Sequence, residues 1–158
     1  MKGENMLHYT HMDTEIGVLT IVEDEGYITR IIFGREMPEG VFFETETLIM
    51  AKAQLREYFE GERMSFTLPV RLYGTDFQKK VWRALVDVPY GKTATYKDIA
   101  EKIGSPKAFR AVGMANNKNP VPIIVPCHRI VGSDGSLTGY AGGIDMKRFL
   151  LTLEEENM

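Results

Sequence analysis

Hydrophobic and polar positions alternate along the first part of the chain in the manner of β-strands. Gly17 to Glu23 and Tyr27 to Phe33 are rich in Ile, Val and Thr, and Asp24 to Gly26 between them is typical of a turn, so a β-hairpin is predicted. Apolar residues then recur at helical spacing, which predicts an amphipathic helix from Thr47 to Glu60. Phe66 to Val70 is compatible with a further strand or a linker.

Clear helix boundaries begin at Thr75. Thr75 and Gln78 have the spacing of a capping box, which opens a helix. Its apolar stripe consists of Phe77, Val81, Trp82, Leu85 and Val86. A second capping box, Thr95 with Asp98, predicts a helix that runs to about Ile103 and ends at a glycine.

The following helix is expected to complete a helix-turn-helix. Ser105 can cap it and Pro106 can occupy its first turn, so a helix is predicted from Pro106 to Asn117. In helix-turn-helix proteins the second, recognition helix enters a groove of DNA. Ile130 to Leu137 is predicted to form a small hairpin, a wing beside the two helices, and Ile144 to Glu155 a closing helix.

These elements predict an α/β (α+β) chain of two parts. Residues 1–70 form an N-terminal scaffold with a small antiparallel sheet and a helix, and residues 74–158 form a helical, winged helix-turn-helix part. Residues 1–70 gather no acids, histidines or Gly-rich loop into a site. His8 and His11 lie in a segment that is expected to be loose.

Composition narrows the class of protein. A chain of 158 residues, 44% hydrophobic and 26% charged, suits one compact globule or two small ones. No apolar run is long enough to cross a bilayer and the start does not resemble a secretory signal, so we expect a cytoplasmic protein, associated with the nucleoid, or nuclear in a eukaryote. The single cysteine excludes an internal disulfide and a Cys-based structural zinc site.

The net charge of −3 conceals an internal asymmetry. From Phe77 to Asn119 there are nine Lys or Arg against three acids, so this segment carries +6 and the remainder −9. Lys and Arg placed against DNA release condensed counterions, and a phosphate-facing surface therefore shows such an excess. A solvated helical face explains the same charges about as well.

The single cysteine, Cys127, is followed directly by a histidine. On frequency alone a lone cysteine is more often a small buried hydrophobe, whereas a nearby imidazole lowers the pKa of a thiol and favours nucleophilic chemistry. In a regular strand the two side chains would point to opposite faces, so His128 must reach the sulfur through a bend or a water, and Pro126 favours a bend. A cysteine-protease arrangement would need a separately placed histidine and an oxyanion hole.

The surroundings of Cys127 resemble a known active-site signature. The stretch from Asn119 to Ile130, which contains Pro-Cys-His-Arg, is similar to that of the O6-alkylguanine-DNA alkyltransferases, and the similarity extends from about Phe77 to Glu154. The resemblance implies a ribonuclease H-like N-terminal part. It also implies a single, irreversible transfer of a methyl or alkyl group from O6-alkylguanine in duplex DNA to Cys127, after base flipping, and leaves O4-alkylthymine open as a second substrate.

The resemblance implies a role for each of several residues. Cys127 is the implied alkyl acceptor, polarised through a water by His128, whose ring Glu154 holds in the needed tautomer. Asn119 is implied to brace the turn that carries the cysteine. Tyr96 is implied to support the leaving guanine and to crowd the target phosphate.

Contacts with DNA and with the base are implied in the same way. Arg110, on the recognition helix, would insert where the extruded base had stacked, although composition alone would favour a phosphate contact. The expected phosphate contacts are Lys97, Ser105 and Ser133. The expected pocket for the alkylguanine consists of Tyr140, Ala141, Gly142 and Ile130. Ala141 stands where some relatives have a hydroxyl residue, and Ile130 where others have valine.

The implied partner is double-stranded DNA that contains O6-alkylguanine, bound by a monomer that needs no metal, cofactor or membrane. Some relatives carry zinc in the N-terminal half, but no cysteine there could supply that site. Two rivals remain open. One is a DNA-binding protein that marks lesions without transfer, although such relatives lack the cysteine. The other is a plain winged-helix regulator with Cys127 in its core.

Overall fold

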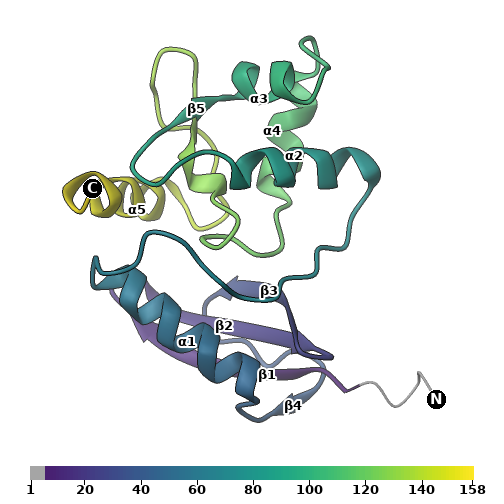
Figure 1. Cartoon of the computed structure of the whole chain (residues 1–158), viewed down its shortest axis with the longest axis vertical. Helices are drawn as coiled ribbons and strands as arrows, with labels where there is room; N and C mark the ends of the chain where they lie inside the picture. The colour runs from purple at the N-terminus through teal and green to yellow at the C-terminus, as the bar shows by residue number, and fades with distance from the viewer. Residues whose placement is uncertain (1–5) are drawn as a thin grey trace. The chain divides into compact units, whose positions relative to one another are not determined.

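The chain divides into two compact units, Met1–Leu72 and Tyr73–Met158, each of which contains both helices and strands. The computed structural model describes residues 6–158 (Figure 1). Among the helices of this described part, none combines the length and the apolar character that a bilayer-spanning helix needs. The mixed α+β class expected from the sequence is confirmed.

The first unit is a four-stranded sheet with one helix on it. Strands β1 (His8–Thr14), β2 (Gly17–Asp24) and β3 (Tyr27–Phe33) are antiparallel, and the short β4 (Val41–Phe42) pairs parallel with β1, in the order β3-β2-β1-β4. Helix α1 (Glu46–Phe59) lies across one face (Figure 1). The predicted hairpin and helix are therefore confirmed, the helix within one residue at each end.

The expectation of a loose segment around His8 and His11 is wrong, because both histidines belong to β1. The strand pairs with β2 along its whole length, from His8 opposite Glu23 to Thr14 opposite Gly17. Its alternation is hidden in the sequence because a polar residue lies buried within it. The Thr10 hydroxyl donates to Glu44 Oε2 at 2.6 Å, which offsets the cost of burying that side chain.

The second unit is mainly helical. Its elements in chain order are α2 (Asp76–Val86), β5 (Ala94–Thr95), α3 (Tyr96–Lys102), α4 (Phe109–Asn117), a 3₁₀ turn (Cys127–Arg129), β6 (Ile130–Val131) and α5 (Ile144–Glu156). Strands β5 and β6 form a parallel pair that joins the start of α3 to the segment just after Cys127. Residues far apart in sequence are thereby brought together.

Both predicted capping boxes are present. The Thr75 hydroxyl and the Gln78 side chain cap α2 reciprocally, and Thr95 and Asp98 do the same for α3. The predicted stripe on α2 ends one residue early, because Val86 is 56% exposed. The core of this unit instead closes around Trp82, whose indole N–H donates to the Ala115 carbonyl at 2.8 Å.

The recognition helix starts later than predicted, and the wing is not a hairpin. Helix α4 begins at Phe109, because the Ala108 N–H binds the Ser105 carbonyl in a separate turn and Ala108 itself lies outside the helical region at φ −90° and ψ 23°. Ser105 is therefore not its cap. The segment after β6 is a loop closed by the bond from Gly132 N to Ser136 O, and the strand that pairs with β6 is β5.

Candidate active site

Cys127 is held at the start of a 3₁₀ turn and is only 4% exposed. Pro126, at φ −80° and ψ 64°, turns the chain, and the Cys127 N–H donates to the Val125 carbonyl at 2.8 Å. The predicted departure from a regular strand is confirmed. As a result, Cys127 and His128 are not forced to opposite faces of a sheet.

Asn119 braces the loop that leads to the cysteine. Its side-chain amide donates to the Val125 carbonyl at 2.8 Å, and its side-chain oxygen accepts the Val121 N–H at 3.0 Å. Within this loop Ile123 is buried with a positive φ of 74°, an unfavourable conformation for a β-branched residue that costs about 1–3 kcal/mol. The bonds to Asn119 help to hold the loop in this shape.

His128 and Glu154 form a fully buried pair. Nε2 of His128 lies 2.6 Å from Glu154 Oε2, and both side chains are inaccessible to solvent. Because a carboxylate only accepts hydrogen bonds, this contact places the ring proton on Nε2. Nδ1 is then the unprotonated nitrogen, and among residues 6–158 it has no hydrogen-bond partner.

Arg129 completes the surroundings of the Glu154 carboxylate. Its guanidinium donates to both carboxylate oxygens, at 2.8 and 3.1 Å, and to the Val88 carbonyl at 2.6 Å. The Gly91 N–H donates to Oε1 at 3.2 Å. Burial raises the pKa of Glu154, but the hydrogen bonds from His128 and Arg129 and the positive charge of Arg129 outweigh it and bring the pKa to about 2. Sequence reasoning missed this role of Arg129, although the residue is part of the Pro-Cys-His-Arg motif.

The electrostatics keep both the thiol and the imidazole neutral at neutral pH. Burial raises the pKa of Cys127 to about 11, although hydrogen bonds from Asn119 and Tyr140 and the charge of Lys147 oppose the shift. Burial also lowers the pKa of His128, in spite of Glu154. A neutral thiol is a poor nucleophile, so the site needs a base that removes its proton.

Lys147, on α5, is a second residue of the site that sequence reasoning did not select. Its side chain is inaccessible to solvent and its ammonium donates to the Thr138 carbonyl at 2.7 Å. Burial lowers its pKa to about 8, and the proximity of Cys127 opposes this shift. When protonated, Lys147 places a positive charge where a thiolate would form.

Tyr96 is the first residue of α3, and its hydroxyl lies 2.7 Å from the Thr138 hydroxyl. Its ring lies against α4, where a Cβ added to Gly113 would be 3.6 Å from two ring carbons. Arg110 is exposed one helical turn before Gly113, so it shares that face of α4. The structure therefore groups Tyr96 and Arg110 on the helix-turn-helix.

The other predicted contacts divide into exposed and buried residues. Lys97, Ser105 and Ser133 are exposed, on α3, in the turn before α4 and in the wing loop. Ala141 is exposed and Gly142 half-buried, whereas Ile130 is fully buried and the Tyr140 hydroxyl is buried within reach of the Cys127 sulfur. Of the four predicted pocket residues, only Tyr140 is thus placed against the cysteine by a described contact.

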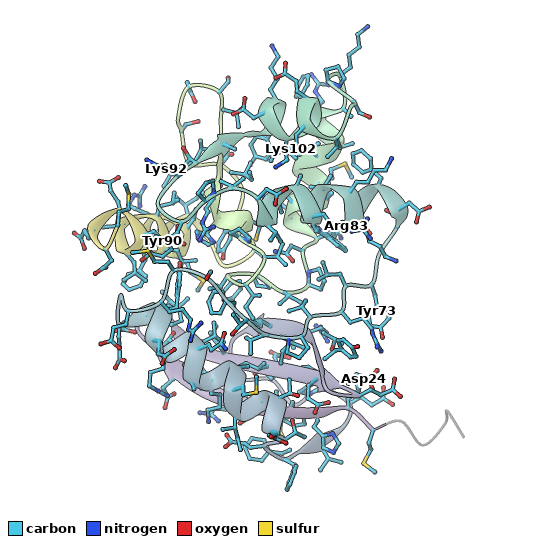
Figure 2. All side chains as sticks on the ribbon, in the orientation of Figure 1. Asp24, Tyr73, Arg83, Tyr90, Lys92 and Lys102 are labelled. Atoms are coloured by element: carbon cyan, nitrogen blue, oxygen red, sulfur yellow. The ribbon has the colours of Figure 1, made fainter. Side chains whose placement is uncertain are left out.

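The basic residues of the second unit lie mostly on its surface. Between Phe77 and Asn119 every Lys and Arg is exposed except Lys79, which is half-buried. Figure 2 labels three of them, Arg83 on α2, Lys92 before β5 and Lys102 at the end of α3. One exposed ion pair, between Lys102 and Asp87 at 3.0 Å, neutralises part of this charge.

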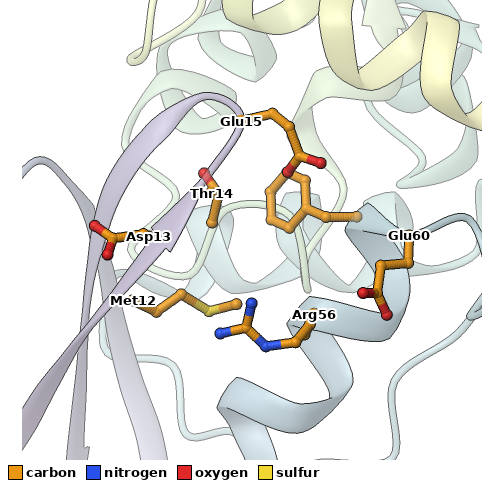
Figure 3. Close-up of a pocket in the computed structure, with 7 residues that line it drawn as sticks. Met12, Asp13, Thr14, Glu15, Arg56 and Glu60 are labelled. Carbon is orange, nitrogen blue, oxygen red and sulfur yellow. The ribbon is translucent and has the colours of Figure 1, made fainter.

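The hollow described in the first unit is small, and its residues are not grouped as metal ligands. A hollow of about 70 Å³ lies between the end of β1 and the last turns of α1, lined in part by Asp13, Glu15 and Arg56 (Figure 3). Ligand pockets usually measure hundreds of Å³. From residue 6 to residue 158, no three His, Cys, Asp or Glu side chains are grouped so that they could hold a metal ion.

Two family models match the chain and together span almost all of it. One, described as the 6-O-methylguanine DNA methyltransferase, DNA binding domain, matches residues 76–156, and the other, the ribonuclease-like domain of the same proteins, matches residues 7–72. The chain belongs to the 6-O-methylguanine DNA methyltransferase family. The family suggested by the Pro-Cys-His-Arg motif is thus confirmed.

Members of this methyltransferase family from several organisms are similar over nearly their whole length. A methylated-DNA–protein-cysteine methyltransferase of Methanosarcina barkeri is 46% identical, over 96% of this chain and 99% of its own. A constitutive one of Bacillus subtilis is 48% identical, over 94% and 96%. The crystal structure of the Mycobacterium tuberculosis protein named OGT in complex with DNA is 44% identical, with a TM-score of 0.85, over 95% and 94%.

Proposed function

We propose that this protein repairs DNA by direct reversal, taking the alkyl group of O6-alkylguanine onto the sulfur of Cys127. The observation that carries the proposal is the buried pair beside the cysteine. Glu154 accepts the Nε2 proton of His128 at 2.6 Å and so leaves Nδ1 as the basic nitrogen. His128 follows Cys127 directly in the chain, so the site contains an orientated imidazole with an unprotonated nitrogen, as a base for the thiol requires.

The proton of the thiol is the first obstacle, because the pKa of Cys127 is raised to about 11. Nδ1 of His128 takes this proton through a bridging water, and the imidazolium that forms is stabilised by Glu154. The arrangement corresponds to the triad of a serine protease, with a thiol in place of the serine hydroxyl and Glu154 in place of the aspartate. Lys147 assists, since its positive charge favours the thiolate.

The transfer itself is a displacement at the alkyl carbon. The sulfur forms a bond to that carbon while the bond from carbon to O6 breaks, and the electron pair leaves with guanine. The Tyr96 hydroxyl supports the leaving base as its charge develops. The product is a thioether on Cys127, which none of the proposed site residues can hydrolyse, so each molecule acts once.

Access to O6 requires that the nucleotide leave the duplex, because side chains cannot reach the alkyl carbon within the base stack. Arg110, exposed on α4, fills the space of the extruded base, and Lys97, Ser105 and Ser133 hold the phosphates. The base enters a pocket formed by Tyr140, Ala141, Gly142 and Ile130. Residues 74–158 thus carry DNA binding and transfer, and residues 1–70 act as a scaffold.

The partner in this proposal is double-stranded DNA with O6-alkylguanine, bound by a monomer in the cytoplasm at the nucleoid. The decisive experiment measures the intact mass of the protein after mixing with a duplex that contains one O6-methylguanine. We expect one methyl group in place of the thiol hydrogen, in an amount equal to the lesion supplied. A duplex with ordinary guanine and the Cys127→Ala variant are the controls.

An unchanged mass of the native protein would overturn the proposal. If the protein then still bound the modified duplex more tightly than the ordinary one, it would be a lesion-recognising protein without transfer activity. If it bound the modified and the ordinary duplex equally well, a plain DNA-binding regulator would be the better description. Labelling with O6-benzylguanine separates the alkyltransferase from both alternatives without DNA, because only the alkyltransferase captures the benzyl group covalently.

A further inference from the structure

Thr138 connects two parts of the site through its hydroxyl and its carbonyl. Its hydroxyl lies 2.7 Å from the Tyr96 hydroxyl, and its carbonyl accepts the Lys147 ammonium at 2.7 Å. We propose that Thr138 is a positioning residue for the alkyl transfer, which fixes and polarises the Tyr96 hydroxyl and is itself held in place by Lys147. This inference rests on the proposed function.

The Tyr96 ring is confined at two points. Its side lies against Gly113 of α4, where a Cβ would be 3.6 Å from the ring, and its hydroxyl lies against Thr138. The ring contact limits where the side chain lies, but it does not orient the hydroxyl proton. Thr138 is the hydrogen-bond partner that the structure describes for this hydroxyl, so it determines which way the proton points.

A hydroxyl partner offers more than an anchor. Thr138 can donate to the Tyr96 oxygen, since either atom of this pair can be the donor. The Tyr96 proton is then free to point at the leaving guanine, and the donated hydrogen bond stabilises the negative charge that develops on the tyrosine oxygen as its proton is shared with the base. Serine at position 138 retains this chemistry, and valine, of nearly the same shape, loses it.

The position of Thr138 needs support, because it lies in the irregular segment between β6 and α5. The described backbone bonds within this segment close the turns from Gly132 to Ser136 and from Tyr140 to Gly143, on either side of Thr138. Lys147 fixes Thr138 itself through the hydrogen bond to its carbonyl. A buried ammonium is costly to leave unpaired, so the bond from Lys147 to the Thr138 carbonyl is a strong constraint.

Two contacts account for the buried position of Lys147. One buried cation lies near the Cys127 sulfur and holds the residue that orients Tyr96. Lys147 and Thr138 therefore connect Cys127, which attacks the alkyl carbon, with Tyr96, which supports the leaving guanine. A substitution of Thr138 should therefore reduce the rate of alkyl transfer more than the affinity for DNA.

The test compares Thr138→Val with Thr138→Ser in single-turnover transfer from a duplex that contains O6-methylguanine. We expect Thr138→Val to slow the transfer about fivefold, the usual worth of one hydrogen bond, and Thr138→Ser to remain within about twofold of the native rate. Thr152→Val, the same change at an exposed position of α5, is the matched control and should have no effect. Affinity for an unmodified duplex should be equal in all four proteins.

A double-mutant cycle with Tyr96→Phe separates positioning from loosening of the loop. Without the tyrosine hydroxyl, Thr138→Val should cause no further loss of rate. A native rate of transfer in Thr138→Val would overturn the inference. So would a double variant in which the losses of rate of Thr138→Val and Tyr96→Phe multiply. Either result leaves the proposed function intact. Failure of the proposed function is recognised separately, because the native protein itself would then transfer no methyl group.

Discussion

Arg129 and Glu154 form a two-point ion pair in which the carboxylate is completely buried, with Nε to Oε1 at 2.8 Å and Nη2 to Oε2 at 3.1 Å. The second oxygen also accepts the proton of His128 Nε2. Arg129 thus keeps the carboxylate ionised and fixes its plane, so that the orientation of the imidazole depends on a residue two positions after the cysteine.

Replacing Arg129 with Met should destabilise the protein strongly. The change leaves the Glu154 carboxylate buried without its main cationic partner and the Val88 carbonyl without the guanidinium donor. Breaking a buried pair in this way costs about 3–5 kcal/mol. The free energy of unfolding, measured by urea denaturation with enough range to define the slope, should fall by this amount.

The matched control for Arg129 is Arg148→Met. Arg148 also pairs with an acid, Asp145, at 3.1 Å, but both side chains are exposed. Exposed pairs contribute about 0–1 kcal/mol, so this variant should remain close to the native stability. Equal, small losses in the two variants would contradict the view that the buried pair organises the site.

Stability should fall as the pH is lowered, in two steps. The pKa of Glu154 lies at about 2, below its ordinary 4.5, so the unfolded chain takes up this proton first and the stabilisation is lost as the pH falls from about 4.5 towards 2. The pKa of His128 is lowered from 6.5, so its contribution begins to disappear below that pH. Titration of either group therefore lowers the stability as the pH falls.

The measurement is the urea midpoint between pH 8 and pH 2. Glu154→Gln should be less stable at neutral pH but should show a flatter profile below pH 4.5, because a neutral amide has no proton to gain. A native midpoint that rises on acidification through this range would mean that Glu154 is not held as a carboxylate in the folded protein.

Local chemistry made much of the fold predictable from the sequence. The capping boxes at Thr75 and Thr95 set the starts of α2 and α3 because each cap needs only residues three positions apart. β1 was not predictable in this way, because its buried Thr10 is stabilised by Glu44, 34 residues away. The pairing of β6 was not predictable either, because its partner is the distant β5.

The candidate site shows the same division. Cys127 and His128 are adjacent in sequence and stand in a recognisable motif, and the resemblance to a family added Glu154. Lys147 carried no signal, because a lysine on a helix is normally exposed and only the folded chain shows it buried against Thr138. The pattern of apolar and polar residues predicts helices and strands, but it does not predict which single residues meet across long distances in the chain.

Arg110→Ala should separate base flipping from chemistry. Arg110 is exposed on α4, so its removal should leave the fold unchanged. An inserted side chain offsets part of the few kcal/mol that unstacking costs, so transfer from a modified duplex should slow by roughly tenfold or more. Transfer from free O6-benzylguanine, which needs no flipping, should stay within about twofold of the native rate. Equal losses on both substrates would place Arg110 in the chemical step instead.

Lys97→Ala should change the salt dependence of DNA binding, because a lysine that neutralises a phosphate releases a counterion. Lys97 is exposed on α3. In a plot of the logarithm of affinity against the logarithm of salt concentration, the slope should become shallower by about 0.9, whereas Ser133→Ala, which removes a neutral contact, should weaken binding at an unchanged slope. Lys52→Ala removes a lysine of the first unit and should alter neither quantity. An unchanged slope in Lys97→Ala would remove this lysine from the phosphate-binding surface, whatever its effect on affinity.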